Sequence, residues 1–201
     1  MKRLASVMAI VLYLSLSAFS QSLTQADRDK AMKYLESTKQ GVLDATAGLS
    51  DAQWNFKPAP DRWSVAEVTE HITAAEGYLR GMVLEKVMTA PPRPEGEDVA
   101  ATDQMVLTMI PDRSHKAQAP EPLKPSNRFG SPQGTIKEFT ESRAQTEDFL
   151  RTHDDLRAHA IDSPIGKKLD AYEWVLFIAA HSERHTKQIL EVKADPNFPK
   201  K

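Results

Sequence analysis

The stretch that decides the fold is "DAYEWVLFIAAHSERHTKQI", residues Asp170 to Ile189. Asp170, with Glu173 three positions later, matches a capping box and predicts the start of a helix that runs to about Lys193. At about 100° per residue, six side chains share a sector of about 80°: Trp174, Ile178, His181, His185, Ile189 and Val192. Two histidines therefore lie on the core-facing stripe of this helix.

Three further segments show the same helical period. They are about Thr24 to Leu49, about Ser64 to Met88, and the helix that follows Ser131. Ser64 and Glu67 form a second capping box, and Ser131 is a cap with Pro132 at the first helical position. No alternating run bounded by hairpin turns indicates a strand. Four long helices predict an all-α fold, a four-helix bundle.

The connection between the second and third long helices is long and rich in proline. It extends from Ala90 to Ser131 and contains one short helical candidate, Val99 to Ile110. The part from Pro111 onward is longer than an ordinary bundle loop. We expect it to be either a cover over one end of the bundle or a mobile lid, and to set substrate specificity.

The first twenty residues differ from the rest of the chain. The basic start Met1 to Arg3 precedes an apolar run, and small residues near Ser20 suit cleavage by a signal peptidase. We expect residues 1–20 to be a signal peptide, with an uncleaved anchor as the alternative. The mature protein would then be exported, periplasmic or secreted, without a stable membrane anchor. Residues 23–193 would form the bundle domain, and residues 194–201 a C-terminal tail without fixed structure.

Composition excludes several classes of function. The formal net charge of −2 and the pI near 6.3 show no basic footprint, so nucleic acid is not an expected partner. With eight glycines the chain has no Gly-rich phosphate loop of a known type. The absence of cysteine excludes disulfides, thiolate zinc sites, a cysteine nucleophile and a lipoprotein anchor.

The histidine pair is a candidate metal site. A buried imidazole without hydrogen-bond partners costs about 1–3 kcal/mol, and a shared cation would satisfy one nitrogen of each ring. His71, between Val68 and Ala75 on the inner side of the second helix, is the best third ligand. The other three histidines lie in or beside loops and are expected to be solvated: His115, His153 and His159. Spacing alone leaves metal ligands and structural core histidines as open alternatives.

Two known helical metal motifs do not fit. The zincin motif requires glutamate directly after the first histidine, where this chain has Ser182. Glu183 lies about 200° around the helix from His181. The di-iron carboxylate motif requires glutamate three residues before each ligand histidine, and these positions hold Val68, Ile178 and Ser182.

The combination of motifs resembles the DinB superfamily of metal-binding four-helix bundles. The resemblance rests on Trp63-Ser64 opening a helix, His71 seven residues after that serine, and Trp174 followed by "HSERH" in the last helix. It covers roughly Leu23 to Leu190.

The resemblance implies one divalent metal ion held by His71, His181 and His185, with open positions for water. Zinc is the first choice of metal; nickel, iron and manganese are alternatives. The open positions predict metal-assisted hydrolysis of a small-molecule substrate that the sequence does not identify. The alternatives are a thiol transferase, which the export signal disfavours, and a non-catalytic binding protein stabilised by its metal. The resemblance also implies a homodimer. We assign no general acid or base, because capping accounts for Glu67.

Overall fold

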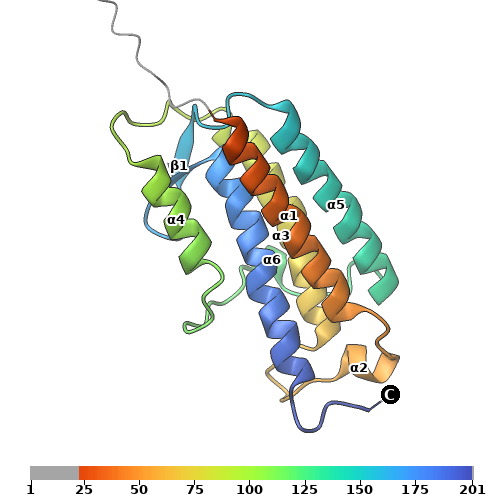
Figure 1. The fold of residues 1–201 in the computed structure, drawn as a ribbon. Helices are drawn as coiled ribbons and strands as arrows, with labels where there is room; N and C mark the ends of the chain where they lie inside the picture. The colour runs from red at the N-terminus through yellow and green to blue at the C-terminus, as the bar shows by residue number, and fades with distance from the viewer. Residues whose placement is uncertain (1–22, 201) are drawn as a thin grey trace, which may run out of the picture.

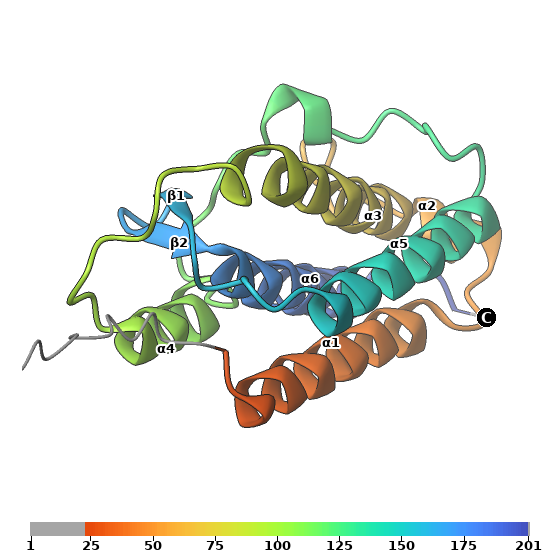
Figure 2. The ribbon, with the colours of Figure 1, turned by 90° about the horizontal axis from the view of Figure 1, so that it is seen from above.

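Four long helices form a bundle in the computed structural model, which describes residues 23–200 (Figure 1). Their bounds are α1 Gln25–Thr46, α3 Val65–Met82, α5 Pro132–Thr152 and α6 Ala171–Lys193. Helices α1 and α3 each pack against both α5 and α6, so α1 and α3 lie diagonally across the bundle (Figure 2). The predicted all-α four-helix bundle is confirmed.

Side chains cap the starts of these helices as predicted. The Ser64 hydroxyl accepts the Glu67 backbone N–H at 3.2 Å, and the Glu67 carboxylate accepts the Ser64 N–H at 2.8 Å. Asp170 and Glu173 form the same reciprocal pair at 2.8 and 2.7 Å. Ser131 caps α5 through the Gly134 N–H. Both capping boxes predicted from the sequence are present, and they fix where α3 and α6 begin.

Shorter helical elements lie between the long helices. They are α2 Asp51–Asn55, the π-helical turn η1 Val83–Val87, α4 Val99–Met109 and the 3₁₀ turn η2 Glu121–Leu123. The second predicted helix therefore ends as a π-helical turn, and α4 matches the short helical candidate closely. Helix α4 packs against the outside of α6, as Figure 1 shows.

A short hairpin precedes α6. Strand β1, Ala160–Asp162, pairs antiparallel with β2, Lys168–Asp170, and Gly166 in the turn has φ +72°. The expectation of no strand is wrong here, because three residues are too few to show an alternating pattern. The hairpin places the capping residue Asp170 directly before α6.

An ionic network fastens the early part of the connection to the start of α6. Arg157 bonds both carboxylate oxygens of Asp103 in α4, at 2.7 and 2.8 Å, and Asp170 at 3.0 Å. Arg93 in the connection bonds both oxygens of Glu173, at 3.0 and 3.1 Å. Guanidinium–carboxylate pairs of this bidentate kind hold orientation as well as position.

The hydrophobic core consists of two clusters separated along α6. The first contains Tyr172, Leu176 and Ala179, and the second contains Ile189 together with Phe139. Each large apolar side chain fully buried in them contributes about 1.5–3 kcal/mol. The stretch of α6 between the clusters contains polar side chains, including both histidines of the candidate site.

The sequence predicts a signal peptide at the N-terminus. The predicted signal peptide, residues 1–20, lies outside the described residues. Among residues 23–200 no helix is both long and apolar enough to span a membrane.

At the C-terminal end, Phe198 packs edge-on against Phe56 with ring centroids 5.5 Å apart, and Gln53 donates to the Pro199 carbonyl at 2.9 Å. The prediction of a tail without fixed structure is therefore wrong for residues 194–200, because an aromatic side chain docks on the second cluster.

Candidate metal centre

Three histidines from two helices meet inside the bundle. His71 of α3 and His181 and His185 of α6 each place one ring nitrogen within 4.8 Å of the other two. Ring centroids are 5.0 Å apart for His71 and His181, 4.5 Å for His71 and His185, and 4.3 Å for His181 and His185. Zinc–nitrogen bonds are about 2.0–2.1 Å long, so this spacing is close to what one ion needs. The residues proposed from the sequence converge and could hold a metal ion.

The helices place these rings at different depths. His71 is 3% exposed on the inner face of α3, whereas His181 and His185 are half-buried. Trp63 packs on His71 with centroids 5.0 Å apart, and Phe177 stacks on His181 at 6.4 Å. Aromatic rings therefore pack on two of the three histidines, and the two histidines of α6 are the partly solvent-exposed members of the group.

Hydrogen bonds orient two of the three rings. His71 Nδ1–H donates to the Leu123 carbonyl oxygen at 2.9 Å, and His185 Nδ1–H donates to Gln188 Oε1 at 2.8 Å. Each bond leaves the Nε2 lone pair of its ring free to ligate. Metal-binding histidines usually donate their other N–H to such an acceptor. The donor set therefore fits a divalent metal ion.

The surroundings keep the three rings neutral, which is the form that binds metal. Burial lowers the pKa of His71, and the charge of Arg128 lowers it further. Burial also lowers the pKa of His181 well below its ordinary value, with contributions from the other two rings and Arg184. The pKa of His185 falls to about 3, mainly through burial and the neighbouring His71.

These shifts predict how the metal-free protein responds to acid. The folded pKa values lie below the unfolded value near 6.5, so between the two the unfolded chain binds more protons. The contribution of these three rings to the free energy of unfolding should therefore be constant above about pH 7 and fall as the pH drops below 6.5, by up to about 1.4 kcal/mol per unit for each ring. Denaturant titrations of chelated protein at several pH values measure this slope.

The matched control for the acid response is His181→Gln, which removes one titrating ring from the group. Its slope should be shallower by up to about 1.4 kcal/mol per pH unit. Equal slopes for the variant and the parent would show that His181 does not titrate as described.

The connection that follows α4 lies against the histidine group. It passes α6 and α3 before reaching α5 (Figure 2). Arg184 of α6 donates to the carbonyl oxygen of His115 at 2.6 Å. Glu70, beside His71, accepts the backbone N–H groups of Ser126, Asn127 and Arg128 at 2.7, 2.8 and 3.2 Å. These contacts hold the connection beside the histidine-bearing parts of α3 and α6, and the choice between a cover and a mobile lid stays a prediction.

Several residues of this centre were not found from the sequence. Gln188 follows His185 by three residues, and that spacing on a helix could have indicated it. The Leu123 carbonyl and Glu70 depend on how the connection folds back, which no local pattern shows. Among the remaining histidines, His115 is exposed as expected. His159 is half-buried, and its Nδ1 has no hydrogen-bond partner among residues 23–200, so the solvated expectation does not hold for it.

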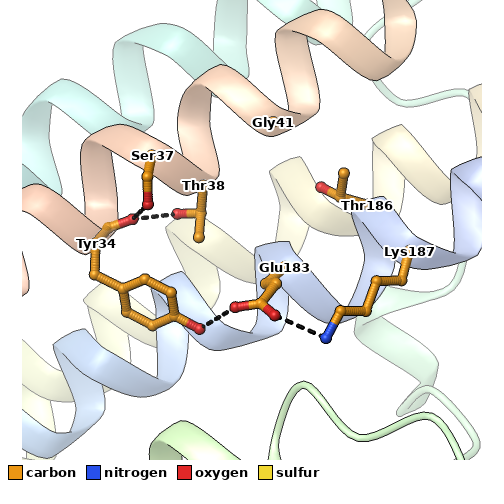
Figure 3. A pocket seen from close by; sticks show the side chains of 7 residues that line it. All are labelled: Tyr34, Ser37, Thr38, Gly41, Glu183, Thr186 and Lys187. Carbon is orange, nitrogen blue, oxygen red and sulfur yellow. Dashed lines mark hydrogen bonds and ion pairs between the residues drawn. The ribbon is translucent and has the colours of Figure 1, made fainter.

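A separate shallow pocket of about 200 Å³ lies between α1 and α6 (Figure 3). In it the Tyr34 hydroxyl donates to Glu183 at 2.6 Å, and Lys187 pairs with the same carboxylate at 2.7 Å. Glu183 reaches Tyr34 of α1, whereas His181 and His185 meet His71 of α3 (Figure 3). The metal centre and this pocket therefore lie on different sides of α6.

Comparison with known proteins settles the family. The model of the DinB superfamily matches residues 34–189. The chain belongs to the DinB superfamily. The match spans α3 and nearly all of α6, so all three histidines lie inside the DinB region.

Two proteins of Bacillus subtilis are similar to this DinB chain. The uncharacterized protein YuaE of strain 168 is 29% identical over 147 residues, which are 73% of this chain and 86% of YuaE. The solved structure of YfiT is described as a probable metal-dependent hydrolase with an unusual four-helix bundle topology. It matches with a TM-score of 0.57 at 17% identity, over 89% of this chain and 93% of YfiT. At that identity the likeness shows the four-helix-bundle fold alone.

Proposed function

We propose that this chain is an exported hydrolase that uses one divalent metal ion, held by His71, His181 and His185, to cleave an ester, amide or lactone-like bond in a small molecule. The observation that carries the proposal is the convergence of three neutral imidazoles at a place that solvent reaches. The description of YfiT supports the reaction class. Zinc is our first choice, because imidazole nitrogen suits it; nickel, iron and manganese remain alternatives.

The residues of the site divide into ligands and groups that orient them. When bound there, a divalent ion would polarise a substrate carbonyl and lower the pKa of coordinated water toward about 7. The three ligands are neutral and cancel none of its charge. The Leu123 carbonyl and Gln188 hold two of the rings in the orientation for ligation. Glu67 is occupied by its backbone cap and by Lys57, so it has no part in this chemistry.

The partial exposure of the site favours an enzyme. The alternative is a non-catalytic protein that stores its metal or is stabilised by it. A purely structural ion is enclosed by its ligands, whereas His181 and His185 are half-buried and border solvent. Export is proposed from the basic and apolar start of the sequence alone. A protein outside the cytoplasm has little access to low-molecular-weight thiols, so hydrolysis is preferred to thiol transfer.

The test is hydrolysis of a panel of activated esters and lactones by the purified protein loaded with Zn²⁺. Removing the ion with a chelator should lower the rate by at least about 100-fold, since a Lewis acid contributes several kcal/mol to such reactions. Adding Zn²⁺ back should restore the rate. Heat-denatured protein with the same zinc content is the control. A rate of hydrolysis that does not change when the chelator is added would reject the proposal. If the metal-loaded protein transfers thiols but hydrolyses none of the substrates, thiol transfer would replace hydrolysis as the proposed reaction.

A further inference from the structure

The connection reaches His185 through a chain of polar contacts. Arg113, just after α4, bonds Glu191 of α6 through Nε at 2.6 Å and through Nη2 at 2.7 Å. This bidentate pair fixes the plane of the guanidinium group. The remaining nitrogen, Nη1, lies 3.4 Å from Gln188 Oε1, the atom that accepts the N–H of His185 at 2.8 Å.

The hydrogen-bonding roles of Arg113, Gln188 and His185 depend on one another. A guanidinium group only donates, so Arg113 favours the orientation of Gln188 in which the amide oxygen, and not the NH₂, faces it. That oxygen can accept from His185 only if Nδ1 carries the proton. The proton on Nδ1 leaves the lone pair on Nε2, the nitrogen that is then free to face the other two histidines. Arg113 thus sets an amide orientation, and the amide sets a histidine tautomer.

We propose that Gln188 and Arg113 are positioning residues that hold His185 in its metal-binding tautomer, and that the connection thereby controls the metal affinity of the bundle. The inference rests on the metal-binding part of the proposed function and is independent of hydrolysis. Since His71 also donates to the connection, at Leu123, two of the three ligand rings are oriented with its participation.

The first test replaces the amide acceptor with an apolar side chain of similar size. Gln188→Leu should bind Zn²⁺ and Co²⁺ about 10-fold to 100-fold more weakly, the usual loss when a partner of a ligand histidine is removed. Competition with a chromophoric chelator measures this affinity. Gln188→Glu keeps an acceptor in place and should stay within about 3-fold of the parent. The matched control is Gln40→Leu, because Gln40 bonds only Asp44 on the exposed face of α1.

The second test reads the tautomer directly in the metal-free protein. The ¹⁵N chemical shifts of the His185 ring should report the Nδ1–H form in the parent and a mixture of both forms in Gln188→Leu. Arg113 is half-buried and belongs to neither hydrophobic cluster, and Arg113→Leu should also produce a mixture and weaken Zn²⁺ binding by about 3-fold to 10-fold. This variant decides the matter if Gln188→Leu fails to fold.

Each outcome has a distinct meaning. Unchanged affinity and tautomer in Gln188→Leu would overturn the proposal, and so would equal losses in Gln188→Leu and Gln188→Glu, since Gln188 would then act through packing alone. A parent protein that binds no metal would contradict the proposed function instead. In that case the tautomer measurement would still decide whether Gln188 and Arg113 orient His185.

Discussion

Replacing His181 with alanine is expected to remove the metal ion. Two imidazoles remain, and stable protein sites for zinc-like ions use at least three protein ligands. Metal content measured on the purified protein should fall from about one ion per chain to nearly none, and chelator-sensitive hydrolysis should fall to the background rate. The helical signal in circular dichroism should persist, because His181 lies between the two hydrophobic clusters and belongs to neither of them.

The matched control for His181→Ala is His115→Ala. His115 is exposed, lies outside the three-histidine group, and contacts Arg184 through its backbone carbonyl alone. This variant should keep its metal and its activity. Full metal content in His181→Ala would show that the three histidines do not form the site.

Replacing Arg143 with methionine is expected to cause the largest loss of stability of any single change considered. Arg143 and Glu76 are both fully buried, and two bonds of 2.7 Å join the guanidinium group to the carboxylate. Arg143→Met would leave the Glu76 charge buried with only the Thr146 hydroxyl as a partner. Removing one partner of a buried ion pair costs about 3–5 kcal/mol, which is a large part of the stability of an ordinary domain. Denaturant unfolding measures the change.

A double variant separates the ion pair from its surroundings. Glu76→Leu combined with Arg143→Met removes both charges and should recover at least about half of the loss, because apolar side chains can replace a buried pair at little cost. The control is Arg151→Met, which breaks an exposed pair with Asp148 and should change stability by no more than about 0.5 kcal/mol. A loss below about 1 kcal/mol in Arg143→Met would contradict a stabilising pair.

The buried pair also bears on the metal centre. Arg143 of α5 donates to the Leu35 carbonyl of α1 at 2.6 Å, to Glu76 of α3, and to the hydroxyl of Ser182 of α6 at 2.8 Å. One side chain therefore connects all four long helices at the level where α3 and α6 present their histidines. Ser182 directly follows His181, so this contact fixes the relative height of the two ligand-bearing helices.

Much of the fold could be predicted because its signals are local. Ser64 with Glu67 and Asp170 with Glu173 mark helix starts through contacts three residues apart, and the apolar period follows from the helix itself. The hairpin before α6 and the docking of Phe198 could not be predicted in this way. The strands of the hairpin are too short to show an alternating pattern, and Phe198 contacts residues far away in the sequence.

The three histidines of the site could also be predicted from local patterns, but their partners could not. His181 and His185 are one turn apart, and His71 stands out as the inward-facing histidine of another helix. The partners that orient or surround them come from elsewhere: Leu123 and Arg113 lie in the connection, and Glu76 meets Arg143 across the core. No local pattern identifies Glu76 as the carboxylate that compensates Arg143, because the two residues lie 67 positions apart in the chain.

The distribution of the three ligands has a consequence for the order of assembly. Of the three ligands, an unfolded chain holds only His181 and His185 close together, because His71 comes from a distant part of the polypeptide. The third ring arrives when α3 packs against α6, an event driven by the hydrophobic clusters and the buried ion pair. In contrast to small domains that fold around zinc, we therefore expect the three-histidine site to be complete only once the bundle has folded.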